Sequence, residues 1–116
     1  MIPGLCNLFQ ALKGTNGGFS VSASPAYVLA RGSGTVATDP ITATPSGGTP
    51  GYTYAWVYSG GDGSVTPVSP TSATTTFNAT VASGDDKIAY YTCNVTDSAS
   101  NMASSNTVTV EIQAAT

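Results

Sequence analysis

The fold is decided by the stretch Pro45-Ser46-Gly47-Gly48-Thr49-Pro50-Gly51-Tyr52-Thr53-Tyr54-Ala55-Trp56. Its first half concentrates proline and glycine, which mark turns, and its second half alternates aromatic residues with small ones. Because successive side chains of a strand point to opposite faces, Tyr52, Tyr54 and Trp56 share one face. The stretch therefore predicts a turn that leads into a central β-strand.

The same period of two recurs from Phe19 onward, with β-branched residues and short turns between the segments. Two other strands have inward faces of this kind, namely Ala89, Tyr91, Cys93 and Val95 in one and Val108, Val110 and Ile112 in the other. Strands are predicted over 19–23, 27–31 with a continuation to 37, 41–44, 52–58, 64–68, 73–81, 87–96 and 106–113. The sequence thus predicts an all-β antiparallel sandwich of seven to nine strands, with Trp56 and Tyr91 buried near Cys93.

Residues 1–18 differ from the rest of the chain. Their apolar residues recur at spacings of three and four, which favours a turn or two of amphipathic helix ended by the sequence GTNGG. These apolar residues are Leu5, Leu8, Phe9 and Leu12. We expect an N-terminal arm over 1–18 and a sandwich domain over 19–116. The arm either packs on its own domain or docks on another subunit, and in the second case these four residues bind the partner.

Charge is scarce in this sequence, at 8% of the 116 residues, and the net charge is −3. The basic residues are only Lys13, Arg31 and Lys87, so no cationic patch is expected that could bind nucleic acid. No run approaches the roughly 18 apolar residues that a membrane-spanning helix needs. We therefore expect neither nucleic acid nor a membrane among the partners.

Catalytic groups are also scarce. The sequence has no histidine, which removes the commonest general base and metal ligand. The aspartates fall in predicted turns, where they are expected to be solvated, and none has the alternating spacing of a calcium loop. They are Asp39, Asp62, Asp85, Asp86 and Asp97. We expect no enzyme, no cofactor and no metal site, with calcium only a weak alternative.

The first residues, MIPGLCNLFQALKG, lack the basic segment and the unbroken apolar run of a secretory signal. Synthesis in the cytosol would keep thiols reduced, so Cys6 and Cys93 are expected as free thiols. Aromatic residues gather on the two strands expected to be central, and alternation places most of them inside. It leaves Tyr90 and Tyr58 as candidates for binding at the surface.

Several motifs in the sequence resemble motifs of known domains. Tyr91-Thr92-Cys93 together with Trp56 resembles the tyrosine corner and core tryptophan of immunoglobulin domains, although Ala43 or a neighbour stands where the first intersheet cysteine would be. The stretch 45–56 resembles the Gly-Gly-Thr-Pro-x-Tyr-x-Tyr-x-Trp signature of bacterial PKD-type immunoglobulin-like domains. Residues 93–99 and 105–110 are similar to the last two strands of that group, and the resemblance covers about residues 19–113.

Small proteins with this Ser/Thr-rich pattern are similar to immunoglobulin-like proteins of tailed bacteriophage virions. That resemblance implies an accessory structural protein, made in the bacterial cytoplasm, that decorates a capsid or tail surface and is anchored to other virion subunits by its arm. The alternative is an immunoglobulin-like module, such as an adhesin fragment, that binds carbohydrate or a cell surface, with host glycans as partners. Such a module would need exposed aromatic residues beside Asn or Asp on a single face.

Overall fold

The computed structural model describes residues 19–115, and within that range the regular structure consists of strands. The arm residues Leu5, Leu8, Phe9 and Leu12, and Cys6, lie outside the described residues. No helix in the described range could cross a membrane. The strands are β1 (Ser20–Ser24), β2 (Tyr27–Gly32), β3 (Gly34–Ala37), β4 (Ile41–Ser46), β5 (Thr53–Gly61), β6 (Thr66–Pro67), β7 (Thr74–Thr75), β8 (Phe77–Val81), β9 (Asp86–Thr96), β10 (Met102–Ser104) and β11 (Val108–Ala114).

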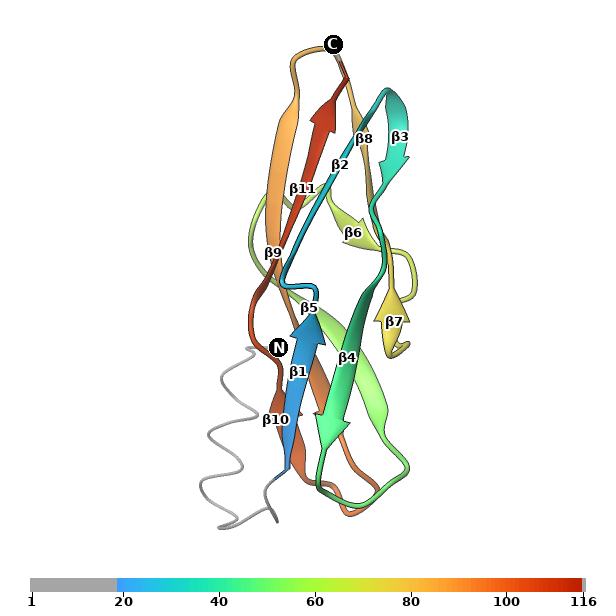
Figure 1. Ribbon diagram of the computed structural model, residues 1–116, viewed down its shortest axis with the longest axis vertical. Coiled ribbons are helices and arrows are strands. Elements are labelled where there is room, and N and C mark those ends of the chain that lie inside the picture. Colours follow the sequence, from blue (N-terminus) through green and yellow to red (C-terminus); the bar gives the residue numbers. More distant parts are fainter. Residues whose placement is uncertain (1–18, 116) are drawn as a thin grey trace.

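The strands form two layers (Figure 1). One layer consists of two three-stranded sheets, β1-β4-β7 and β3-β8-β6. These sheets lie end to end along the length of the domain, because β3 leads into β4 and β7 leads into β8. The other layer contains β5, β9, β11 and β2 side by side, with β10 pairing the lower part of β9. The expected all-β sandwich is therefore confirmed.

The strand pattern differs from the predicted one in one pairing. We expected antiparallel neighbours throughout, but β2 pairs with β11 in parallel, from Tyr27 opposite Thr109 to Gly32 opposite Ala114. The cause is a change of layer between β1, which pairs with β4, and β2, which pairs with β11. The chain continues upward in the second layer, in the same direction as β11 (Figure 1).

Two of the predicted strands are divided in the structure, and one strand was missed. The strand predicted over 27–37 divides at Ser33, and its halves β2 and β3 belong to different layers. The strand predicted over 73–81 divides at Thr76 into β7 and β8. The short strand β10 was not predicted at all, because three residues carry no detectable period, and its pairing with Asn94, Val95 and Thr96 is not visible in the sequence. Residues 19–115 therefore form eleven strands where seven to nine were expected.

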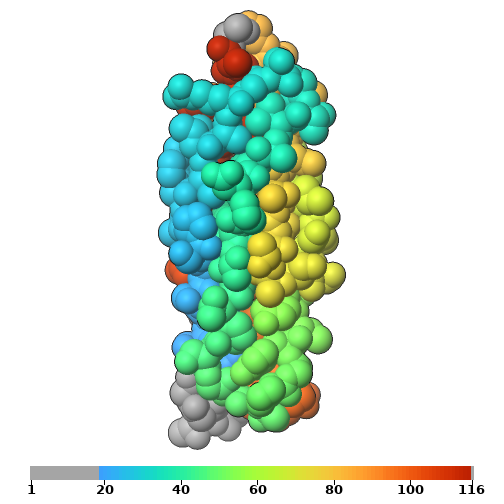
Figure 2. Space-filling model, turned by 45° about the vertical axis from the view of Figure 1, so that its right-hand side comes forward, coloured from blue at the N-terminus to red at the C-terminus, as the bar shows by residue number. Residues whose placement is uncertain are grey.

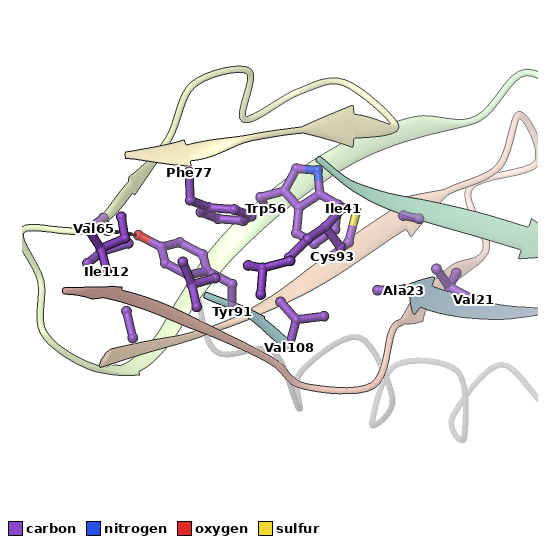
Figure 3. Packing of buried hydrophobic residues seen from close by; sticks show 14 of the residues in the cluster. Val21, Ala23, Ile41, Trp56, Val65, Phe77, Tyr91, Cys93, Val108 and Ile112 are labelled. Carbon is purple, nitrogen blue, oxygen red and sulfur yellow. Dashed lines mark hydrogen bonds between the residues drawn. The ribbon is translucent and has the colours of Figure 1, made fainter. Parts of the chain in front are cut away.

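An aromatic cluster fills the middle of the sandwich (Figure 3). Phe77 packs edge-on against Trp56, with ring centroids 5.8 Å apart, and lies 4.9 Å from the ring of Tyr91. The indole Nε1 of Trp56 donates a hydrogen bond of 2.8 Å to the carbonyl of Ser72. All three rings are buried, as expected for Trp56 and Tyr91, and Cys93 lies beside them.

Tyr91 differs from the tyrosine corner that its position suggested. In a tyrosine corner the hydroxyl group bonds a carbonyl only a few residues upstream. Here the Tyr91 hydroxyl donates a buried hydrogen bond of 2.6 Å to the carbonyl of Val65, 26 residues earlier in the chain. The bond therefore ties β9 to the segment that follows β5 rather than closing a local corner.

The inward faces predicted for the last two long strands are confirmed, because their seven residues are all buried. The face predicted for β5 is confirmed in part, since Trp56 is buried while Tyr52 and Tyr54 are half-buried against the core. Cys93 is a buried free thiol, as expected, and burial raises its pKa to about 11. Such a thiol is inert at neutral pH.

Asp97 is a correction to the expected solvated aspartates, because it is buried in the turn that joins β9 to β10. Its carboxylate accepts hydrogen bonds from the backbone N–H groups of Thr49, Ala99 and Asn101 at 2.9, 3.0 and 2.8 Å. Although burial acts to raise the pKa of Asp97, these hydrogen bonds outweigh it and hold the pKa below its ordinary value. The charged carboxylate therefore holds two loops together at this end of the sandwich.

We predict that Trp56→Ala lowers the free energy of unfolding by about 3–5 kcal/mol, as large aromatic truncations in cores do. The substitution removes the ring that packs on Phe77 and leaves the carbonyl of Ser72 without its donor. Chemical denaturation followed by circular dichroism measures the loss. Val68→Ala, at an exposed position, is the control and should change stability by less than about 0.5 kcal/mol. A loss below about 1 kcal/mol for Trp56→Ala would contradict the packing described here.

We predict that Asp97→Asn destabilises the domain at neutral pH, because the native pKa of Asp97 is lowered and the charged form is the one stabilised. That stabilisation is fully present above the unfolded pKa of about 3.9 and is lost as pH falls through the lower native value. The difference in melting temperature between the variant and the unsubstituted chain should therefore shrink below that pH. Asp39→Asn, at an exposed position, should show no such difference at any pH.

Candidate binding face

The outer face of the layer formed by β2, β11 and β9 presents a regular array of side chains. The strand registers place three residues in each of three rows, because each β11 residue lies opposite one residue of β2 and one of β9. The rows are Tyr27-Thr109-Tyr90, Leu29-Glu111-Ile88 and Arg31-Gln113-Asp86. We call these nine residues the outer face. All are exposed or half-buried, whereas the alternate residues of the same strands point into the core.

Glu111 is the centre of a hydrogen-bonded network on the outer face. Its carboxylate accepts a hydrogen bond of 2.7 Å from the Tyr27 hydroxyl and one of 2.8 Å from the Gln113 side-chain amide. The side-chain carbonyl of Gln113 accepts a bond of 2.7 Å from Nε of Arg31. Four side chains from two strands are therefore held in fixed orientations relative to one another.

A second carboxyl group joins this network. In its protonated form Asp86 can donate a hydrogen bond to the Glu111 carboxylate, and this interaction raises the pKa of Asp86 above its ordinary value. Hydrogen bonds from Asp86, Tyr27 and Gln113 lower the pKa of Glu111. The bond that Tyr27 donates to Glu111 also raises the pKa of the Tyr27 hydroxyl. Of the two carboxyl groups, Glu111 is therefore the one that keeps its charge to lower pH.

The outer face also carries large apolar surfaces. Tyr27 is 51% exposed, Leu29 41% and Tyr90 39%. Tyr27 and Tyr90 both lie opposite Thr109, so two strand spacings separate their Cα atoms, about 10 Å. The face thus combines two exposed aromatic rings with charged and amide groups whose positions are fixed.

The two surface candidates from the sequence do not lie together. Tyr90 belongs to the outer face, whereas Tyr58 lies opposite Tyr91, on the inward phase of β5. Tyr58 is nevertheless 46% exposed because it lies at the rim of the sandwich, where its ring meets Tyr91 edge-on at 5.9 Å. Its hydroxyl donates a hydrogen bond to the carbonyl of Gly61. A role for either residue in binding stays a prediction.

Sequence reasoning missed Tyr27 and Leu29 as surface residues. The signal was present, since Val28 is a buried apolar residue between them and period-two alternation then assigns both to the outside. Alternation likewise assigns Glu111, between the buried residues Val110 and Ile112, to the outside, and the structure shows it half-buried within the network. Asp86 was expected in a turn, but it is the first residue of β9. Its place opposite Gln113 depends on the register and is not visible in the sequence.

The described residues do not suggest another kind of centre. Within 19–115 there is no group of three or more histidine, cysteine, aspartate or glutamate side chains that could hold a metal ion. Asp62 accepts bonds from the backbone and hydroxyl of Ser64 within its own turn, and these bonds lower its pKa. The outer face is therefore the candidate site that we consider.

Comparison with known proteins identifies the fold. The PKD domain of human KIAA0319 is similar over 89% of this chain and 92% of that domain, with a TM-score of 0.57 and 13% identity. A nucleoside hydrolase-related protein of Saccharophagus degradans, associated with carbohydrate metabolism, matches 86% of this chain, which spans only 26% of that protein (TM-score 0.53, 18% identity). A conjugative transposon lipoprotein of Bacteroides eggerthii has a TM-score of 0.41 at 20% identity. No family model and no curated protein matches the chain.

The likeness to the PKD domain shows an immunoglobulin-like sandwich fold, as the sequence motifs implied. At 13–18% identity these likenesses bear on the fold and not on a function. None of them links the chain to bacteriophage proteins.

Proposed function

We propose that this domain is a binding module that recognises a hydroxyl-rich ligand, of the carbohydrate class, through its outer face. The observation that carries the proposal is the pair of exposed tyrosines, Tyr27 and Tyr90, beside the Glu111 network on a single face. Aromatic rings offer flat apolar surfaces on which the C–H side of a sugar ring can lie. Carboxylate, amide and guanidinium groups supply acceptors and donors for its hydroxyl groups.

The geometry suits an extended ligand better than a small enclosed one. The outer face is the surface of a sheet, and the separation of about 10 Å between Tyr27 and Tyr90 leaves room for more than one ring of an oligosaccharide. The polar side chains are already oriented by one another, so little conformational entropy is lost when a ligand binds to them.

The second candidate is an accessory role on a bacteriophage virion, made in the bacterial cytoplasm. It is supported by the apolar spacing of Leu5, Leu8, Phe9 and Leu12, which would give the arm a strip able to bind a capsid or tail subunit. The two candidates use different parts of the chain. A domain anchored by its arm could present its outer face to host glycans, so one could serve the other.

We predict that the domain binds members of a glycan array, and that Tyr90→Ala and Tyr27→Ala each weaken the binding about tenfold, the effect of losing roughly 1.4 kcal/mol of ring contact. Isothermal titration with the best array ligand measures the affinities. Tyr58→Ala is the matched control, because it removes an equally exposed tyrosine from the opposite side of the layer. Binding lost in Tyr58→Ala and kept in Tyr90→Ala would reject the outer face as the site, and an array without any hit would reject the ligand class.

We predict for the virion candidate that a chain beginning at Gly18 folds with nearly unchanged melting temperature and no longer attaches to particles that lack the protein. The described residues form a contiguous hydrophobic core among themselves, so we expect folding not to need residues 1–18. Thermal unfolding and co-sedimentation with particles measure the two properties. Unfolding of the truncated chain would assign the arm to its own domain, while normal attachment would place the docking surface on the sandwich.

A further inference from the structure

The strand β2 forms one edge of its layer. It pairs with β11, and among the described residues no strand pairs with its other side. Figure 2 shows this segment in light blue along the left margin of the molecule. An open strand edge presents backbone donors and acceptors that can pair with another strand.

The hydrogen bonds to β11 identify the open groups. The N–H of Thr109 donates to the carbonyl of Ala26, and the N–H of Ala115 donates to the carbonyl of Gly32, both at 2.8 Å. Since backbone groups of successive residues point to opposite sides of a strand, the even-numbered residues of β2 face β11. The N–H and carbonyl groups of Tyr27, Leu29 and Arg31 therefore point to the open edge.

This edge lacks the features that usually block pairing. The sequence of β2, Tyr-Val-Leu-Ala-Arg-Gly, has no proline and a single charge, and its register with β11 is unbroken over six residues. The strand β5 at the other end of the layer is different. It carries a bulge between Tyr58 and Gly60, and the N–H of Trp56 is already bonded to the carbonyl of Pro70.

We propose that the open edge of β2 pairs with the same edge of a second copy of this chain, antiparallel and about a two-fold axis at Leu29. In this register Leu29 lies opposite Leu29 of the second copy, and Tyr27 lies opposite Arg31. All three residues with open backbone groups are then paired, which gives six hydrogen bonds, and any other register pairs fewer of them. The β2-containing layer of one copy would then join the same layer of the other copy into one continuous sheet.

The side chains on this edge are self-complementary, which favours a second copy over an unrelated strand. In the proposed register the guanidinium group of each Arg31 lies beside the ring of Tyr27 in the other copy, an attractive cation–π arrangement. The hydroxyl of that tyrosine is bonded to Glu111, so each positive charge meets a negatively charged site. The exposed side chains of Leu29 meet at the axis, where burial removes both from water. Tyr27 and Arg31 also belong to the outer face, but the backbone pairing itself requires no ligand on that face.

The first test compares two lysine substitutions in the full chain by sedimentation velocity over a range of concentrations. The unsubstituted chain should shift toward the dimer as concentration rises. Leu29→Lys should abolish that shift, because it places like charges opposite each other at the axis. Val68→Lys, which changes an exposed apolar residue elsewhere, should keep it. A chain that stays monomeric throughout, or a dimer that survives Leu29→Lys, would overturn the proposal, and circular dichroism shows whether each variant is folded.

The second test fixes the register by cross-linking in a Cys6→Ser background. Directly opposed residues in a hydrogen-bonded pair have Cα atoms about 5.5 Å apart, within the range of a disulfide. Leu29→Cys should therefore form a covalent dimer under mild oxidation. Arg31→Cys should not, since the two cysteines would be about 14 Å apart along the strands. Cross-linking of Arg31→Cys and not of Leu29→Cys would show a different register and refute the two-fold axis at Leu29.

Discussion

The pairing of β9 with three other strands is the constraint on which the rest of the sandwich depends. This strand lies against β5 on one side and against β11 and β10 on the other, so its register fixes the position of all three. Its inward residues Tyr91 and Cys93 are buried in the core, and the Tyr91 hydroxyl donates a hydrogen bond to the carbonyl of Val65, which follows β5 in the chain. Its outward residues supply one column of the outer face. A slip of a single residue would exchange these two sets, which would bury Tyr90 and expose Tyr91.

Much of the fold could be predicted from the sequence, because it depends on local alternation. The inward residues of β9 and β11 and the turn before Tyr52 follow from a period of two and from turn residues. What could not be predicted depends on pairings between distant residues. The strand β10 exists because β9 holds it, and the parallel direction of β2 follows from the change of layer after β1. Similarly, Asp97 has the sequence context of a solvated turn and is buried only because the loop containing Thr49 lies against it.

The candidate site likewise combines features that could be predicted from the sequence with features that could not. Exposure of Tyr90 was predictable from one strand, but its place beside Tyr27 was not, since those residues lie 63 positions apart and meet only through the register of β11. The network around Glu111 likewise needs the alignment of two strands from opposite ends of the domain. Side-chain chemistry can be read from a sequence, whereas the combination of side chains on one face is a property of strand order.

The parallel pair of β2 and β11 has a mechanical consequence. The start of β1 lies at one pole of the sandwich and the end of β11 at the other (Figure 1), so tension applied between these points acts along the strands. The six residue pairs between Tyr27–Gly32 and Thr109–Ala114 would then be loaded together in shear, and no single bond could be peeled away before the others. Along this direction the domain should therefore resist extension more strongly than one whose terminal strands separate one hydrogen bond at a time.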